Sequence, residues 1–194
     1  MTEEALAAIM AKLPVYLRPV VEFCYLTGLR KQEALKLAWD RVDWQAKTVR
    51  LDPGKTKSGE GRTFPFGTYP RLEALLKARR AASSAWDLAH PSAKADRVFW
   101  RPAGDHAAPI SDFHDTWQRA CRNAEHEGAW LHDTRRSAVR NLERAGVSRS
   151  VAMKLTGHKT EAVYRRYAIT TAGDLEEAVG KLGRAVGDAH GADK

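Results

Sequence analysis

The chain has 194 residues and a mass of 21.6 kDa, the size of one ordinary domain or two small ones. A chain of this length buries about 70% of its unfolded surface when it folds. Its composition, 43% hydrophobic and 29% charged, excludes a disordered tail and a collagen-like chain. The sequence contains no run of 18 apolar residues, which excludes a membrane-spanning helix and predicts no membrane partner.

The N-terminus and the cysteines predict a compartment. Met1-Thr2-Glu3-Glu4 is acidic where a secretory signal would be basic, so the sequence predicts a cytoplasmic location. Two cysteines, Cys24 and Cys121, are too few for a disulfide scaffold. Cys24 lies in an apolar run and is interpreted as a reduced core residue.

The positive charge is the first indication of function. The formal net charge is +8 and the sequence pI is about 9.7. Such a domain commonly binds a polyanion, most often nucleic acid, although solubility alone is the other interpretation. Residues 132–167 hold nine basic and three acidic residues, whereas residues 168–194 hold three basic and five acidic ones. The excess of positive charge therefore lies in one part of the chain.

The first third of the chain predicts helices followed by strands. Helices are expected over Thr2 to Leu13, with Thr2 as N-cap, over Arg18 to Thr27, ending at Gly28, and over Lys31 to Ala38. Strand composition marks Val42, 48–51 and 62–66. The connector between the last two holds three glycines and a proline, which predicts a β-hairpin with a long, mobile loop.

The remainder is mostly helical in pattern. The expected helices are 69–80, 82–89, 111–126, 132–145, 148–156, 160–167 and 171–185, with one short strand at 97–100 and a loop at 101–109. The predicted fold class is mainly α with a small antiparallel β-sheet. No domain boundary is visible, so residues 1–194 are expected to form one domain, with 171–194 as a C-terminal helix and tail.

Three short motifs carry side chains suited to phosphate chemistry. His132 and Arg135 share a helix face, where an imidazole can exchange a proton and a guanidinium can bind an oxyanion. Tyr167 follows His158 by nine residues and lies among arginines that favour a phenolate nucleophile. Arg30 follows the helix stop at Gly28. Each motif also has a structural explanation when it is taken singly. His132 and Arg135 could be surface decoration, and Arg30 could be a solvated arginine at a joint between two helices. Tyr164 and Tyr167, three residues apart, could simply cover a helix face.

Taken together, the motifs resemble the catalytic domain of the tyrosine recombinases, the phage-integrase family, over roughly residues 3 to 170. The matching stretches, in order, are Thr27-Gly28-Leu29-Arg30-Lys31-Gln32-Glu33, the hairpin Thr56 to Pro65, His132-Asp133-Thr134-Arg135, Leu155-Thr156-Gly157-His158 and Tyr164-Arg165-Arg166-Tyr167-Ala168. The resemblance implies an integrase-like fold and a DNA strand transferase that works through a 3′-phosphotyrosyl intermediate.

The resemblance also implies a role for each matching residue. Arg30 and Arg135 resemble the two arginines that hold the scissile phosphate, and His158 matches a position that bonds the phosphate. Lys57 resembles the lysine that protonates the leaving 5′ oxygen, and Lys55 is its rival. His132 is similar to the histidine that manages the proton of the nucleophile. Tyr167 resembles the nucleophile, whereas Tyr164 does not fit the count of nine from His158.

Further residues are expected around these six. Glu33 and Asp133 are expected to support the site. The expected DNA contacts are Arg136, Arg140, Lys159, Arg165 and Arg166. Arginine and histidine donors can neutralise a phosphodiester without a metal ion, so no metal and no cofactor is expected. Neither a His-Glu-x-x-His motif nor paired cysteines are present in the sequence.

The sequence departs from the family at its N-terminus. Members usually carry a separate helical domain that closes around DNA, and here only the helix from Thr2 precedes the Arg30 region. The resemblance implies double-stranded DNA as the partner, and a tetramer on DNA in which the C-terminal helix docks on a neighbouring subunit. Two alternatives stay open: a DNA-binding fragment or regulator with weak catalysis, and a type IB topoisomerase-like enzyme.

Overall fold

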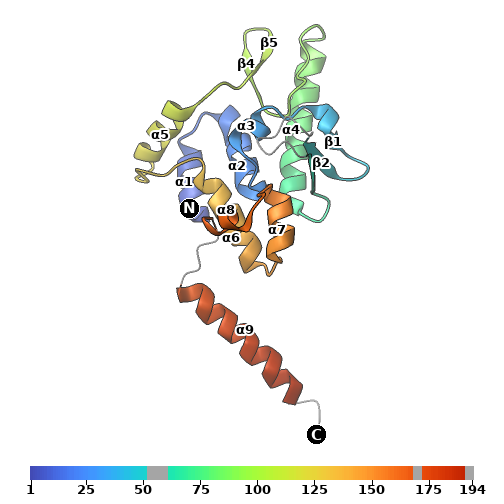
Figure 1. Cartoon of the computed structure of the whole chain (residues 1–194). Coiled ribbons are helices and arrows are strands. Elements are labelled where there is room, and N and C mark those ends of the chain that lie inside the picture. Colours follow the sequence, from blue (N-terminus) through green and yellow to red (C-terminus); the bar gives the residue numbers. More distant parts are fainter. Residues whose placement is uncertain (52–60, 168–171, 191–194) are drawn as a thin grey trace.

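The computed structural model describes residues 1–51, 61–167 and 172–190. Helices dominate, together with two small antiparallel sheets (Figure 1). In chain order the elements are α1 (Glu3–Ala11), η1 (Val15–Leu17), α2 (Arg18–Thr27), α3 (Lys31–Leu35), η2 (Trp39–Arg41), β1 (Val42–Asp43), β2 (Thr48–Leu51), β3 (Arg62–Pro65), α4 (Pro70–Ala89), β4 (Trp100–Ala103), β5 (His106–Pro109), α5 (His114–Asn123), α6 (Asp133–Arg144), α7 (Arg149–Thr156), α8 (Glu161–Arg165) and α9 (Ala172–His190). The predicted fold class is confirmed.

Local sequence signals set the first helices. The Thr2 hydroxyl accepts a hydrogen bond from the backbone N–H of Ala5 and so caps α1, as predicted. Helix α2 spans the predicted residues and ends at Gly28, whose φ of 67° is left-handed. A Cβ at Gly28 would lie 3.1 Å from side-chain atoms of Ala138 and Thr156. Gly28 therefore lets α2, α6 and α7 meet closely.

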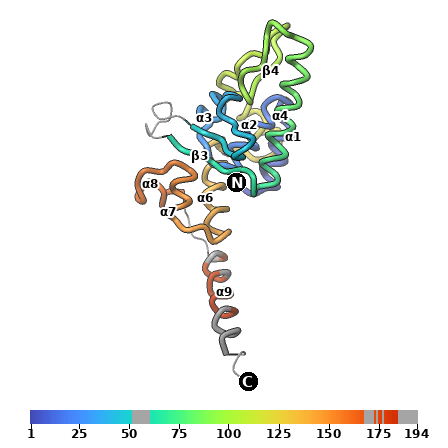
Figure 2. The backbone as a smooth tube through the Cα atoms, turned by 90° about the vertical axis from the view of Figure 1, so that its right-hand side faces the viewer, coloured from blue at the N-terminus to red at the C-terminus, as the bar shows by residue number. Residues whose placement is uncertain are grey.

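A three-stranded antiparallel sheet follows in the order β1-β2-β3. Val49 of β2 pairs with both Val42 and Phe64, and all three side chains face the core. Helix α7 contacts β3, so the sheet lies against the C-terminal helices as well as the N-terminal ones. Figure 2 shows β3 beside α7 and α8. This contact brings the hairpin strand to the region that holds the candidate site.

Three predictions in the middle of the chain were wrong. The strand predicted at 97–100 begins only at Trp100, since β4 spans Trp100–Ala103 and Arg97 makes an isolated bridge with Ala38. The segment 101–109, predicted as a loop, contains most of a β-hairpin in which Ala103 pairs with His106 around the turn Gly104-Asp105. Prolines and alanines in these strands hide the strand pattern, although a Gly-Asp dipeptide is a hairpin signal. The two helices predicted over 69–80 and 82–89 are one continuous helix, α4.

The main core joins α1, α2, the first sheet, α4 and α5. Its largest fully buried side chains include Trp117, Phe23, Phe66 and Phe99. Cys24 is buried and unpaired, as expected. Apolar burial of this kind contributes roughly 1.5–3 kcal/mol per large side chain and holds α2 as a fixed support for the residues that follow it.

The last helices form a second layer. Val139, Ala152 and Tyr164 make a separate buried cluster that joins α6, α7 and α8. Helix α9 extends away from the rest of the molecule (Figures 1 and 2). Lys181 on α9 donates to the backbone carbonyl of Arg144 at 3.3 Å. Within the described part of the chain, no helix is both long enough and apolar enough to cross a membrane.

Candidate active site

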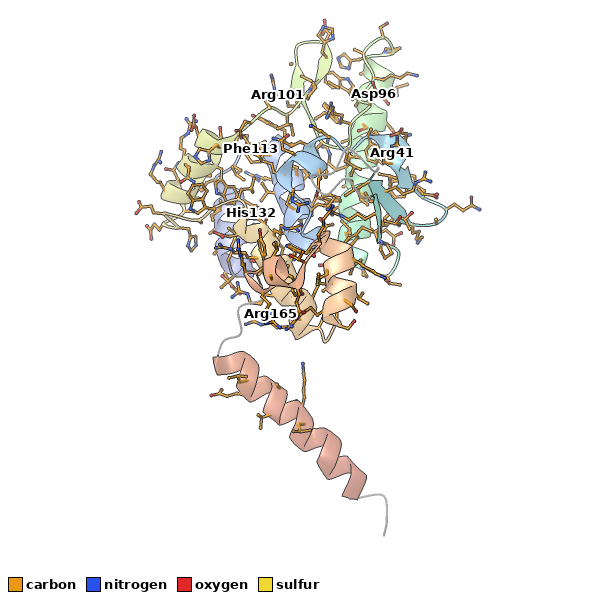
Figure 3. All side chains as sticks on the ribbon, in the orientation of Figure 1. Arg41, Asp96, Arg101, Phe113, His132 and Arg165 are labelled. Carbon is orange, nitrogen blue, oxygen red and sulfur yellow. The ribbon has the colours of Figure 1, made fainter. Side chains whose placement is uncertain are left out.

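A groove with a volume of about 770 Å³ lies where α3, α6 and the segments around α8 converge. Five of the six predicted catalytic residues gather here. The groove is lined by Arg30, His132, His158 and Tyr167, and the buried Arg135 forms a hydrogen bond with His158. The sixth, Lys57, lies outside the described residues, as does its rival Lys55. Figure 3 labels His132 just ahead of α6, near α8.

Arg30 and Glu33 are held together by the start of α3. Glu33 Oε2 accepts from the backbone N–H of Arg30 at 2.9 Å and so caps the helix. Glu33 Oε1 accepts from the guanidinium of Arg30 at 3.0 Å. Burial would raise the pKa of Glu33, but Arg62 and Arg30 together hold that pKa below its ordinary value. Glu33 is therefore ionised and hydrogen-bonded to Arg30.

Arg135 is the most deeply placed of the site cations. It is 1% exposed, and it donates to the carbonyl of Gly28 at the end of α2. Burial lowers the pKa of Arg135 to about 10, with Arg30 and Arg62 adding to the effect. The guanidinium remains charged at neutral pH. A buried arginine whose position is fixed by a backbone carbonyl is preorganised for an anion.

Hydrogen bonds set the tautomer of His158. The Thr156 hydroxyl donates to the carbonyl of Ala152 at 2.7 Å, so its oxygen accepts from Nδ1–H of His158, also at 2.7 Å. Nε2 of His158 then accepts from Arg135 at 2.9 Å. Burial, followed by the nearby arginines, lowers the pKa of His158 to about 3. The imidazole is neutral over the physiological range.

The phenol of Tyr167 faces His132. The hydroxyl of Tyr167 lies 2.9 Å from Nε2 of His132. The Tyr167 ring also contacts His158, with centroids 4.8 Å apart, and lies 5.7 Å from the guanidinium carbon of Arg135. Burial, followed by Arg135 and Arg136, lowers the pKa of His132 below its ordinary value. A neutral imidazole is therefore in place to accept a proton from the phenol.

Tyr164 has a different environment. Its side chain is fully buried and packs with Val139 and Ala152. Burial, followed by the charge of Glu143, raises the pKa of Tyr164 to about 12. It covers a helix face, which is the structural interpretation that remained open for both tyrosines.

The other expected residues are distributed around the groove. Asp133 accepts from the backbone N–H of Trp130 at 2.9 Å and from Arg136 at 3.1 Å, so it stabilises the turn before α6 rather than touching the groove. Arg165 pairs with Glu161 at 3.0 Å. Lys159 is exposed and lines the groove. Arg166, next to Tyr167 in the sequence, is also exposed, and Arg140 on α6 is half-buried.

One charged residue at the site was not predicted to have a role. Arg62 on β3 donates to Glu33 Oε2 at 2.6 Å, and its side chain is 8% exposed. In the sequence it stands within the hairpin motif, where an arginine at a strand end looks like a solvated charge. Its ion pair with Glu33 and its position against Gly157 at the end of α7 show that it points inward.

A family model described as the phage integrase family matches residues 1–172. The chain belongs to the phage integrase family. Among characterised family members, the integrase of Salmonella phage P22 is 26% identical over 165 residues, which cover 83% of this chain and 41% of that protein. The tyrosine recombinase XerD of Mycobacterium leprae is 31% identical over 169 residues, covering 82% of this chain and 50% of the relative. The chain thus spans half or less of the length of these integrase-family relatives.

Solved structures of integrase-family proteins share the fold. XerA recombinase superposes with a TM-score of 0.68 at 16% identity, over 94% of this chain and 64% of that one. XerH in a post-cleavage complex with its difH substrate superposes with a TM-score of 0.64 at 18% identity, over 92% of this chain and 52% of the XerH chain. A lambda integrase tetramer bound to a Holliday junction gives a TM-score of 0.63 at 17% identity, over 87% of this chain and 47% of the lambda integrase chain. The predicted integrase-like fold is confirmed.

Proposed function

We propose that this chain is the catalytic part of a site-specific DNA recombinase that cuts and rejoins DNA through a 3′-phosphotyrosyl intermediate. One observation carries the proposal. The phenol of Tyr167 lies 2.9 Å from the neutral imidazole of His132, at a groove that Arg30 and His158 also line, with Arg135 hydrogen-bonded to His158. A nucleophile, a base and anion-binding donors in one groove are what transesterification at a phosphodiester requires.

The proposed step balances as follows. The Tyr167 oxygen bonds to phosphorus while its proton passes to Nε2 of His132, and the bond from phosphorus to the 5′ oxygen breaks. The 5′ oxygen leaves with a proton, which the family resemblance assigns to Lys57. The new phosphotyrosyl ester retains the bond energy, so the reverse attack by a 5′ hydroxyl reseals a strand without ATP.

Arg30, Arg135 and His158 would neutralise the non-bridging oxygens as phosphorus becomes five-coordinate. Each preorganised donor of this kind contributes about 3–4 kcal/mol to a transition state. Nε2 of His158 would donate to the phosphate if the Thr156 hydroxyl turned from Ala152 to Nδ1, because the imidazole would then carry its proton on Nε2. The same side chain can therefore pair with Arg135 in the free protein and with phosphate in the complex.

Double-stranded DNA is the proposed partner. The groove is lined by Lys31, Lys36 and Lys159 as well as by Arg30, and the chain has a net charge of +8. The related XerH and lambda integrase structures contain DNA. Because the substrate is DNA, a cytoplasmic location is part of the proposal.

Self-association on DNA is proposed through α9. Leu175, Val179 and Leu182 recur on one side of this helix and are each more than 60% exposed. A stripe of this kind fits a neighbouring subunit, and the lambda integrase structure is a tetramer bound to a Holliday junction. Residues 1–167 would then act as one catalytic domain with α9 as its docking element.

The test is covalent trapping on a nicked suicide site, in EDTA and without ATP. The proposal expects a covalent protein–DNA adduct that maps by peptide sequencing to Tyr167. Absence of any adduct would leave a DNA-binding fragment. Efficient relaxation of a supercoiled plasmid that lacks a recombination site would instead indicate a topoisomerase-like enzyme.

A further inference from the structure

Arg62 is a buried cation for which the proposed reaction has no use. Its side chain is 8% exposed, it lies on β3, and it contacts Glu33, which in turn holds Arg30. It shares Glu33 Oε2 with the backbone N–H of Arg30, and it is not one of the residues that the family resemblance assigns to the phosphate.

We propose that Arg62 is a positioning residue that keeps Arg30 and the His158 segment ready for the phosphate. The inference rests on the proposed strand-transfer function. Arg62 acts through Glu33 and through Gly157, and it has no direct contact with the reacting atoms.

The first argument is the local charge balance. Glu33 Oε2 accepts from Arg62 at 2.6 Å, while the same carboxylate accepts from the backbone and the guanidinium of Arg30. Two arginines share one carboxylate, so the group carries one net positive charge. Without Arg62, Arg30 and Glu33 would form a neutral pair, and the electrostatic attraction of this pair for a phosphate would weaken.

The second argument is steric. Gly157 ends α7 with a left-handed φ of 70° and directly precedes His158. A Cβ at position 157 would lie 1.6 Å from a guanidinium nitrogen of Arg62. The guanidinium of Arg62 therefore packs on the bare backbone of Gly157, directly before His158. One side chain thus contacts both α3 and the end of α7.

The third argument is that Arg62 is a poor choice for stability alone. Its Nε and one terminal nitrogen are buried without a hydrogen-bond partner among the described residues. Burial lowers the pKa of Arg62, although Glu33 opposes that shift. A buried ion pair is often no more stable than an apolar pair of the same volume, and unpaired buried donors add a cost. Such a group is best explained by a role at the site.

The experiment compares four proteins by the single-turnover rate of adduct formation and by DNA affinity: wild type, Arg62→Met, the double variant Arg62→Met/Glu33→Gln, and Arg71→Met. Arg71 is the matched control, because it also pairs with glutamates, Glu22 and Glu3, but lies on α4 outside the groove. Thermal unfolding of each variant checks that it folds.

Arg62→Met is expected to slow adduct formation about 10- to 100-fold, the range seen when outer partners of metal ligands are removed. The double variant is expected to recover part of that loss, because neutralising Glu33 restores the net positive charge at Arg30. Arg71→Met is expected to react like wild type. A residue that merely stabilises the fold would lower the unfolding temperature of Arg62→Met and leave the rate of the folded fraction unchanged, whereas a positioning residue slows adduct formation in protein that is folded.

The proposal is overturned if Arg62→Met reacts at the wild-type rate, or if the double variant is no faster than the single one. If Arg62→Met does not fold, the double variant is compared with Glu33→Gln and with Arg62→Lys, which keeps the charge. The charge argument then requires Arg62→Lys to be faster than any neutral replacement at position 62.

Failure of the strand-transfer proposal has a different signature, because wild type itself would then form no adduct. The positioning role is in that case read from the guanidinium NMR signals of Arg30. They should move in Arg62→Met and stay in place in Arg71→Met. Unchanged Arg30 signals in both variants would overturn the inference.

Discussion

The hydroxyl of Tyr167 lies 2.9 Å from Nε2 of His132, although 35 residues separate the two along the chain. The contact joins the turn before α6 to the residues that follow α8. The contact aligns the phenol, a weak nucleophile, with a neutral base near Arg30 and Arg135. Tyr164 makes no such contact with the described residues, because its side chain is buried with Val139 and Ala152.

Exchange of the two tyrosines for phenylalanine tests which one is the nucleophile. Tyr167→Phe should abolish the covalent adduct on a suicide substrate, because it removes the attacking oxygen. Tyr164→Phe should keep adduct formation near the wild-type level, because the phenylalanine ring would still fill the buried cluster with Val139 and Ala152. Gel detection of the adduct is the measurement, and loss of the adduct in Tyr164→Phe alone would reverse the assignment.

The rate of strand cleavage should depend on pH through His132. Burial lowers the pKa of His132 below 6.5, so at neutral pH the imidazole is unprotonated and can accept a proton. The single-turnover rate should therefore be lost only as the pH falls below 6.5 and His132 becomes protonated. His132→Gln should be slow and should lack this acid limb. An acid limb that persists in His132→Gln would point to another base.

Lys57 can be tested by changing the leaving group. Lys57→Ala should slow cleavage of an ordinary phosphodiester, because the 5′ oxygen needs a proton to leave. A 5′-bridging sulfur leaves as a thiolate, since thiols have a pKa of about 8.5, and needs no acid. The variant should cleave the sulfur substrate nearly as fast as wild type. Lys55→Ala is the control and should cleave both substrates like wild type. If Lys55→Ala is slow on the phosphodiester and rescued by the sulfur substrate while Lys57→Ala is not, Lys55 is the acid.

Gly157→Ala should cost both stability and activity. Its φ of 70° is disfavoured for a residue with a Cβ by about 1–2 kcal/mol, and the methyl group would displace Arg62. Gly146→Ala is the matched control, because Gly146 has a φ of 74° and open space around its Cα. Denaturant unfolding and adduct formation should show a larger loss for Gly157→Ala. Equal activity in the two variants would mean that the packing of Arg62 on Gly157 is dispensable.

DNA affinity should fall steeply with salt. If the basic groove contacts about six phosphates, the affinity should drop about 10³-fold between about 50 and 200 mM salt. The measurement is a binding titration at several salt concentrations, and the slope gives the number of ions released. Affinity that does not change with salt would remove the basis for the groove as a DNA surface.

The local sequence determined the early elements well. Thr2 caps α1, Gly28 ends α2, and the strand at 48–51 has the predicted bounds. These features depend on short-range capping, glycine conformation and residue shape, which are readable within a few residues. The hairpin at β4 and β5 was missed because its strands contain prolines and alanines, and tertiary packing overrides weak local preference.

By itself, the sequence determined which side chains were candidates for the site, because the order and spacing of Arg30, His132, Arg135, His158 and Tyr167 resemble a family. The tertiary structure decided which of them meet. Packing of α2 on α6 brings Gly28 to Arg135, and packing of α7 on β3 turns Arg62 inward. The burial of Tyr164 and the turn-stabilising role of Asp133 were likewise decided only there. Desolvation and contact between distant segments depend on the whole fold, and no local pattern in the chain encodes them.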